Sequence, residues 1–313
     1  MRWKVLVTAP YIQPVIDRFR ATFAENQIDV IVPPVNERLA EPELLKWVED
    51  VDGVICGDDQ FTEKVLRTAK RLKVISKWGT GIDSIDREEA EKLGIVVYNT
   101  PNAFTDPVAD TVLGYILSFS RQIPWTDSEM RAGKWEKRTC TTLRNKTLGV
   151  VGVGNVGKAV IRRALGFGMR VLGNDIREIS RDFLKDTGTT MLELDELFGE
   201  SDFVSINCDL NPTSYHLIGK QELNLMKPTA YLVNTARGPI VDEEALIGAL
   251  KNRAIAGAAL DVFEAEPLPK DSLLRQFENC LLSPHNANSS PEAWEHVHRN
   301  TIQNLLNGLQ NKR

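Results

Sequence analysis

The sequence lacks any apolar run of membrane-spanning length, and it lacks an excess of basic residues. Because a membrane-spanning helix needs about 20 apolar residues in a row, no membrane partner is expected. The 313 residues include 43 acidic and 38 basic ones, and the net charge is −5. An acidic balance without a basic stripe disfavours nucleic acid as a partner. The first ten residues also lack the apolar core and cleavage site of a signal peptide, so a cytoplasmic protein is expected.

Cysteine and histidine are scarce, with four of each. The cysteines lie far apart and form no CxxC pair, which favours reduced thiols over disulfides. Two of the histidines, His296 and His298, are two positions apart in a predicted helix. This spacing directs them to different faces, so no metal site is expected.

The residues that are present alternate between short apolar strands and amphipathic helices. In the first hundred residues the strands are expected at 4–9, 28–34, 51–57, 72–79 and 95–100, with helices at 14–26, 41–50, 62–69 and 86–94. A segment with two prolines, 99–107, interrupts this alternation, and a longer helix is predicted over 108–123. The pattern predicts a parallel sheet covered by helices on both faces.

A second alternation begins at Lys146. Its strands are expected at 147–153, 170–175, 202–208, 230–236, 255–262 and 279–285. We therefore expect two α/β lobes, with the second inserted into the first. Residues 1–102 and 288–313 form the first lobe in this interpretation, and residues 103–287 form the second. A final helix over about 291–308 is expected to return to the first lobe.

A glycine-rich turn lies between the first strand and the first helix of the second lobe. Gly152, Gly154 and Gly157 form a G-x-G-x-x-G pattern, and Asp175 ends the next strand. The first glycine permits a tight turn, the second lets the backbone approach a pyrophosphate, and the third lets helix and strand pack closely. A helix N-terminus favours the phosphates. The spacing predicts binding of a dinucleotide.

The acidic residue predicts which dinucleotide is bound. The Asp175 carboxylate can accept hydrogen bonds from both ribose hydroxyls of NAD, and its charge opposes the 2′-phosphate of NADP. Arg177 follows two residues later and weakens this preference for NAD. A solvated turn carboxylate is the alternative for Asp175.

Four polar side chains follow strands of the second lobe, where ligands gather in open α/β sheets. Arg237 offers a planar guanidinium that can bind a carboxylate or a polarised carbonyl. Asp261 and Glu266 follow the next strand, and His285 follows the last one. Taken singly, each residue also fits a structural role: a surface salt bridge for Arg237, a polar loop for the two acids, and a satisfied histidine for His285.

Together these segments resemble the D-isomer-specific 2-hydroxyacid dehydrogenases. The resemblance rests on GVGNVG, NTARGPIVDEEAL, AGAALDVFEAEP and SPH, in this order, and it extends over nearly the whole chain. KWGTGIDSID, from Lys77 to Asp86, resembles the family's substrate loop. Within the family the motifs are most similar to those of phosphoglycerate dehydrogenases. The resemblance implies an NAD-dependent oxidoreductase with a Rossmann domain inserted into a flavodoxin-like substrate domain.

The resemblance also implies roles for individual residues. Arg237 would bind the substrate carboxylate and carbonyl, His285 would be the general acid–base, and Glu266 would orient His285 and stabilise its protonated form. Asp261 would contact the nicotinamide amide. The implied cofactor-binding residues are Gly152, Gly154, Asn155, Val156, Gly157, Asp175, Cys208, Thr235 and Asp261. The implied substrate-binding residues are Lys77, Gly79, Thr80 and Gly81, with backbone N–H groups of Thr80 and Gly81 on the carboxylate.

The substrate stays open between two kinds of 2-oxo acid. Lys77 precedes the substrate loop and favours 3-phosphoglycerate and phosphohydroxypyruvate, although a solvated lysine is the plain alternative. Hydroxypyruvate, glyoxylate or another small 2-oxo acid is the second candidate. A different class of function is an NAD-sensing binding protein, which the acidic balance does not favour.

Three further expectations follow from the resemblance and the chain's pattern. No C-terminal regulatory domain is expected after the last helix. A homodimer is expected to form through residues 118–136. The family commonly has apolar and small residues after its histidine, whereas this chain has Asn286 and Asn288, which can alter the pocket near His285.

Overall fold

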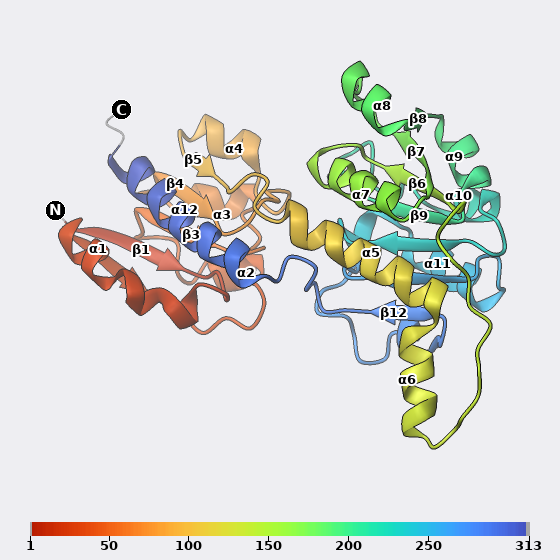
Figure 1. Cartoon of the computed structure of the whole chain (residues 1–313). Coiled ribbons are helices and arrows are strands. Elements are labelled where there is room, and N and C mark those ends of the chain that lie inside the picture. Colours follow the sequence, from red (N-terminus) through yellow and green to blue (C-terminus); the bar gives the residue numbers. More distant parts are fainter. Residues whose placement is uncertain (1, 311–313) are drawn as a thin grey trace. The chain divides into compact units, whose positions relative to one another are not determined.

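The structure is a computed structural model that describes residues 2–310, and these residues form two compact units. The first unit holds residues 2–104 and 290–310, and the second holds residues 105–289. The boundaries at 102 and 287 that the sequence predicts fall two residues before these positions. Figure 1 shows that the last helix runs alongside the elements of the first unit, so both ends of the described chain belong to one unit.

The first unit contains one sheet of five parallel strands in the order β2-β1-β3-β4-β5. This is the flavodoxin-like order, in which ligands bind beside the first strand at the carboxyl edge of the sheet. The strands are β1 (Trp3–Val7), β2 (Ile28–Ile31), β3 (Gly53–Cys56), β4 (Val74–Lys77) and β5 (Val96–Tyr98). The helices are η1 (Gln13–Phe19), α1 (Arg20–Glu25), α2 (Glu41–Leu44), α3 (Glu63–Thr68), α4 (Arg87–Lys92) and α12 (Pro291–Gln310).

Apolar strands and helix caps account for this unit. All residues of β3 and β4 are buried, as expected for central strands covered on both faces. Thr62 and Asp86 cap α3 and α4 by accepting backbone N–H hydrogen bonds. Two expectations from the sequence were wrong in part, because residues 13–19 form a 3₁₀ helix and α2 ends at Leu44, well before residue 50.

The second unit contains a sheet of seven parallel strands in the order β12-β11-β10-β9-β6-β7-β8. Counted from β6, this is the Rossmann order with one added strand. The strands are β6 (Thr147–Val151), β7 (Arg170–Asn174), β8 (Thr190–Met191), β9 (Phe203–Ile206), β10 (Tyr231–Asn234), β11 (Gly257–Leu260) and β12 (Cys280–Leu282). The helices are α5 (Thr105–Arg121), α6 (Ile123–Arg131), α7 (Asn155–Gly166), α8 (Arg181–Thr187), α9 (Leu194–Glu200), α10 (Lys220–Leu225), η2 (Gly238–Ile240), α11 (Glu243–Lys251) and η3 (Leu273–Gln276).

The predicted fold class is therefore confirmed, with two parallel sheets covered by helices. Two features were not predicted from the sequence, the two-residue strand β8 and a break at Gln122. The left-handed φ of 53° at Gln122 separates α5 from α6. In residues 2–310, no helix combines the length and apolarity that crossing a membrane requires.

The packing of α12 on the first sheet gives a testable prediction about stability. A Cβ on Gly308 would collide with the side chain of Val74 on β4, so Gly308→Ala should lower the free energy of unfolding by about 1–3 kcal/mol. The matched control is Gly248→Ala in α11, where a Cβ meets open space. In that variant the free energy of unfolding should rise by up to about 1 kcal/mol. Chemical denaturation measures both, and an equal response would contradict this packing.

Candidate functional site

The glycine-rich turn of the second unit has the backbone geometry that the sequence predicts. Gly152 follows β6 with φ of 90°, and a Cβ there would lie 2.5 Å from the backbone nitrogen of Cys208. Gly154 caps the N-terminus of α7, which begins with Asn155 and Val156. A Cβ on Gly157 would collide with the Gly152 carbonyl oxygen. Only glycine fits at the two crowded positions, and Gly154 presents bare backbone at a helix N-terminus, as dinucleotide phosphates require.

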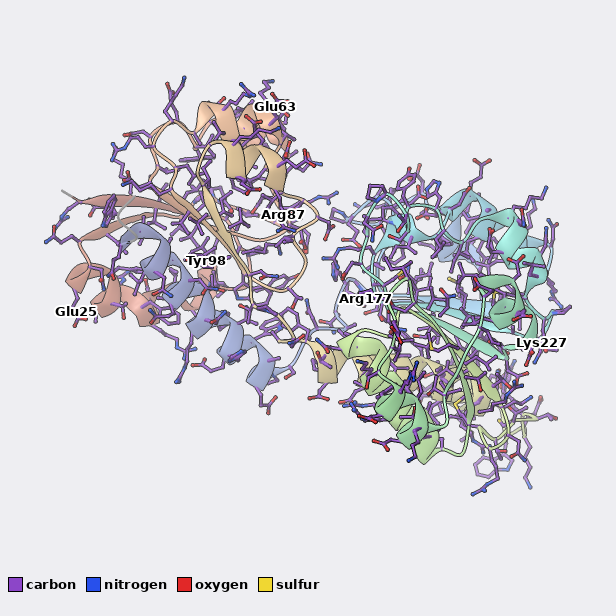
Figure 2. The ribbon with its side chains drawn as sticks, turned by 90° about the horizontal axis from the view of Figure 1, so that it is seen from above. Glu25, Glu63, Arg87, Tyr98, Arg177 and Lys227 are labelled. Atoms are coloured by element: carbon purple, nitrogen blue, oxygen red, sulfur yellow. The ribbon has the colours of Figure 1, made fainter. Side chains whose placement is uncertain are left out.

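Asp175 follows β7, and its side chain is only 4% exposed. Its Oδ2 accepts a hydrogen bond from the Val153 backbone (2.8 Å), and its Oδ1 accepts one from the Arg177 backbone (2.8 Å). Burial would raise the pKa of Asp175, but these hydrogen bonds and the Arg177 guanidinium outweigh it and lower the pKa. Asp175 therefore stays ionised and holds the glycine turn against the loop after β7, where Figure 2 labels Arg177.

Two further predicted cofactor residues follow neighbouring strands. Cys208 lies after β9 and is partly buried, and burial raises the pKa of its thiol to about 11. Thr235 lies after β10, and its hydroxyl is buried without a hydrogen-bond partner in the described part of the chain. Buried hydroxyls nearly always have a partner, so this orphaned group fits a bound molecule. Together with the glycine turn, it shows that the residues present fit a dinucleotide.

Arg237, Glu266 and His285 follow three adjacent strands, β10, β11 and β12, at the carboxyl edge of the second sheet. The Arg237 turn is fixed because the Asn234 side chain bonds both the Ala236 N–H (3.0 Å) and the Arg237 carbonyl (2.9 Å). Gly238 packs so closely on the 263–264 backbone that a Cβ there would collide with it. The loop that carries Glu266 is thus held against the turn that carries Arg237.

Glu266 joins two parts of this edge. Its Oε1 accepts a hydrogen bond from the Phe263 N–H (2.9 Å), and its Oε2 lies 3.0 Å from His285 Nδ1. The two side chains are about four-fifths buried. A carboxylate at this distance stabilises a protonated imidazole and fixes which ring nitrogen faces it. The pair is therefore suited to proton transfer through the other ring nitrogen.

Asp261, which the sequence predicts to contact the nicotinamide amide, lies directly after β11. It is fully buried, and its carbonyl and carboxylate oxygens accept hydrogen bonds from three successive backbone N–H groups. The Asp261 carbonyl binds the N–H of His285, Oδ1 binds that of Asn286, and Oδ2 binds that of Ala287, each at 2.8 Å. Both carboxylate oxygens of Asp261 are therefore engaged by backbone N–H groups of the loop that carries His285.

The task of Asp261 is to fix the backbone of His285. His285 has a φ of 51°, a left-handed conformation that histidine adopts only when its surroundings impose it. Helix α5 supports the same loop, because Thr111 Oγ1 lies 3.5 Å from the Ala287 carbonyl. Burial, followed by the Asp261 charge, raises the pKa of Tyr115 to about 12. This support from α5 was not predictable from any local pattern in the sequence.

In the first unit, the predicted substrate loop directs its carbonyl groups inward. The carbonyls of Trp78, Gly79 and Thr80 accept hydrogen bonds from Lys77 Nζ (3.1 Å), Thr100 N (2.8 Å) and Asn99 Nδ2 (2.6 Å). Because a trans peptide directs its N–H opposite to its C=O, the N–H groups of Gly79, Thr80 and Gly81 point away from these donors. Within residues 2–310, no acceptor binds the N–H of Thr80 or Gly81. Successive N–H groups of this kind can bind an anion.

The ammonium group of Lys77, which the sequence predicts to face a phosphate, is paired with a carboxylate in this structure. Its side chain is 5% exposed, and its Nζ lies 3.0 Å from Asp58 Oδ1. The two adjacent acids after β3 were visible in the sequence, but their distance from Lys77 depends on the pairing of Cys56 with Lys77 in the sheet. In residues 2–310, no three His, Cys, Asp or Glu side chains are grouped so that they could hold a metal ion.

A Rossmann-ordered sheet with a fitting dinucleotide turn, beside a positioned histidine–carboxylate pair, defines a nucleotide-dependent dehydrogenase. The family model for the NAD-binding domain of D-isomer specific 2-hydroxyacid dehydrogenases matches residues 113–287. The chain belongs to this family, and it is an NAD-dependent D-2-hydroxyacid dehydrogenase. This confirms the resemblance and the cofactor that the sequence predicts.

Similar proteins act on several substrates. The glyoxylate reductase of Thermofilum pendens is 40% identical over 309 residues, which cover 95% of this chain and 90% of that protein. The D-3-phosphoglycerate dehydrogenase of Methanocaldococcus jannaschii is 36% identical, and the match covers 93% of this chain but 54% of that protein. The D-lactate dehydrogenase of Aquifex aeolicus, solved with NAD and lactic acid, has a TM-score of 0.86 at 26% identity and covers 96% of this chain and 93% of that one.

The position of Asp175 predicts the effect of removing it. Asp175→Ala should raise the Kd for NADH by about tenfold or more and narrow the preference for NADH over NADPH, because the charge that opposes the 2′-phosphate is lost. Fluorescence titration with both nucleotides measures this. Asp186→Ala, an exposed acid of α8, is the control and should change neither value. A wild-type protein that binds both nucleotides equally well would contradict the role of Asp175.

The role of Asp261 gives a separate prediction. Asp261→Asn places an amide donor against a backbone N–H, so kcat should fall by about 10- to 100-fold while the Kd for NADH stays nearly constant. The control is Asp202→Asn, because Asp202 also accepts a backbone hydrogen bond, from Thr147 (2.8 Å), but at the other edge of the sheet. That variant should keep its kcat. A rise in the Kd for NADH at unchanged kcat would instead favour contact with nicotinamide.

Proposed function

We propose that this dehydrogenase interconverts a small, unphosphorylated 2-oxo acid and its 2-hydroxy acid, with glyoxylate and hydroxypyruvate as the leading substrates. The single observation that carries the choice is that the Lys77 ammonium is paired with Asp58 instead of being available to a phosphate. The relationship to glyoxylate reductases along nearly their whole length supports it. The chain spans about half the length of the phosphoglycerate dehydrogenases it matches.

In this proposal each polar group has a defined role. The N–H groups of Thr80 and Gly81 and the Arg237 guanidinium bind the substrate carboxylate, and Arg237 also polarises the carbonyl oxygen. His285 donates a proton to that oxygen in reduction and accepts it in oxidation. Glu266 orients His285 and stabilises its protonated form. The nicotinamide of bound NADH supplies the hydride.

The cofactor is held by residues of the second unit. We propose that the backbone at Gly154, Asn155 and Val156 faces the pyrophosphate, because it forms the N-terminus of α7. Asp175 would face the adenosine ribose, and Cys208 and Thr235 would line the site after β9 and β10. In this proposal Asp261 contributes indirectly, by holding the backbone of His285. The first unit would be the substrate domain and the second the nucleotide-binding domain.

The cytoplasmic location and the homodimer stay predictions. Apolar side chains of the expected dimer segment are exposed, including Ile123 (56%) and Trp135 (88%). Figure 1 shows α6 projecting from the end of α5. Exposed apolar surface of this kind favours a protein contact, and a second copy of the chain is the partner we propose.

The substrate proposal is tested by the loss of NADH absorbance with a panel of 2-oxo acids. We expect kcat/KM for glyoxylate and hydroxypyruvate to exceed that for phosphohydroxypyruvate by at least about tenfold. A preference for phosphohydroxypyruvate would restore the phosphoglycerate assignment that the sequence favours. Binding of NADH without reduction of any acid in the panel would favour the NAD-sensing alternative.

The proton-transfer proposal is tested by Glu266→Gln. Loss of the carboxylate disfavours the protonated imidazole, so the decline of kcat/KM for reduction at high pH should move to lower pH. Glu264→Gln is a matched control, because Glu264 lies on the same loop but pairs with His216 (2.9 Å). Its pH profile should coincide with that of the wild type. A Glu266→Gln profile that also coincides would remove Glu266 from this role.

A further inference from the structure

A cluster of charged side chains lies at the carboxyl edge of the first sheet. β3 and β4 are neighbours, and Cys56 at the end of one is aligned with Lys77 at the end of the other. Asp58 and Asp59 follow β3 directly, so that both acids reach the edge from which the 78–81 loop begins. The dehydrogenase reaction as described uses neither acid, and the cluster therefore needs its own explanation.

Asp59 fixes the turn that carries Asp58. It is fully buried, and its carboxyl group accepts hydrogen bonds from Thr8 Oγ1 (2.6 Å), Leu39 N (2.6 Å) and Gly57 N (2.9 Å). These donors come from the segments after β1, before α2 and after β3. With three donors around one carboxyl group, the turn at 57–59 has one arrangement. Asp58 is therefore held toward Lys77 by the fold.

Lys77 contacts the backbone of the first residues of the substrate loop. Its Nζ donates to the Trp78 carbonyl (3.1 Å) and lies 3.7 Å from the position that a Cβ on Gly79 would take. Holding this carbonyl inward directs the N–H of Gly79 outward. Lys77 is therefore placed to set the direction of the first N–H group of the proposed carboxylate-binding loop.

The exposed fractions of the Asp58 and Lys77 side chains determine which of the two charges an approaching ligand contacts first. The Asp58 side chain is 37% exposed, whereas that of Lys77 is 5% exposed. An approaching anion thus meets the carboxylate before the ammonium. A phosphate dianion would be repelled at this edge, while a substrate whose one charged group is bound by the loop N–H groups needs no further cation.

We propose that Asp58 is a specificity-determining residue that excludes phosphorylated 2-oxo acids, and that Lys77 is a positioning residue for the 78–81 loop. This inference rests on the proposed function, since it assumes that the loop binds a 2-oxo acid. It deepens that function by naming the residue that separates hydroxypyruvate from its phosphate ester. The two substrates differ only in the group that Asp58 repels.

The test compares kcat/KM for phosphohydroxypyruvate and for hydroxypyruvate, with NADH, in wild type and Asp58→Asn. Removing the exposed charge and leaving the ammonium uncompensated should raise the ratio of phosphorylated to unphosphorylated substrate by about tenfold. The matched control is Asp50→Asn, because Asp50 pairs with Lys4 and Arg71 on the amino-terminal side of β3. This variant makes the same change in net charge and should leave the ratio unchanged.

Two further variants separate charge from positioning. Lys77→Gln should raise KM for both substrates with little change in kcat, because the loop N–H groups lose their alignment. The rise should be larger for phosphohydroxypyruvate, because the Asp58 charge is then uncompensated. The double variant Asp58→Asn with Lys77→Gln should keep the substrate ratio above the wild-type value but below that of Asp58→Asn, because the repelling carboxylate is gone and no uncompensated ammonium remains. Lys77→Gln also tests the inference independently if Asp58→Asn alone is too unstable to assay.

Two results would overturn the inference. One is an unchanged ratio in folded Asp58→Asn that still reduces glyoxylate. The other is a Lys77→Gln variant whose KM rises for phosphohydroxypyruvate alone, since Lys77 would then bind the phosphate itself. A wild type that reduces no unphosphorylated acid contradicts the proposed function instead, and it is recognised before any variant is made.

Discussion

The functional loops of both units depend on acidic side chains that accept hydrogen bonds from backbone N–H groups. Asp261 holds the N–H groups of Asn286 and Ala287, Asp175 holds those of Val153 and Arg177, and Asp59 holds those of Leu39 and Gly57. An N–H group or an acid left unpaired in such places would cost on the order of 1–3 kcal/mol or more. Each loop therefore has one favoured conformation.

This arrangement separates the residues that hold a loop from those that would act on the substrate. His285 keeps an unfavourable left-handed backbone because Asp261 binds it, and its imidazole remains paired with Glu266. Glu264 lies on the same loop as Glu266 and pairs with His216. This second histidine–glutamate pair joins that loop to the segment before α10. The two distances are similar, but His216 binds through Nε2 and His285 through Nδ1. Of the two pairs, only His285 with Glu266 follows strand ends next to the one that carries Arg237.

The sequence predicts the fold and the glycine turn because their signals are local. Apolar runs mark the strands, and Gly152, Gly154 and Gly157 are spaced by the geometry of a single turn. The partners of Asp261 and Lys77 are not predictable in this way. Asp261 reaches residues 25 and 26 positions away, and Lys77 meets Asp58 only because β3 and β4 are paired in one register. Local composition also could not show that residues 13–19 would form a 3₁₀ helix.

The most direct test of this account is amide hydrogen exchange of the free protein and of its complex with NADH and oxamate, an unreactive 2-oxo acid analogue. The account predicts slow exchange at Asn286 and Ala287 in both states, because Asp261 binds these N–H groups. It predicts fast exchange at Thr80 and Gly81 in the free protein and slower exchange in the complex. Fast exchange at 286 and 287, or no change at 80 and 81, would contradict it.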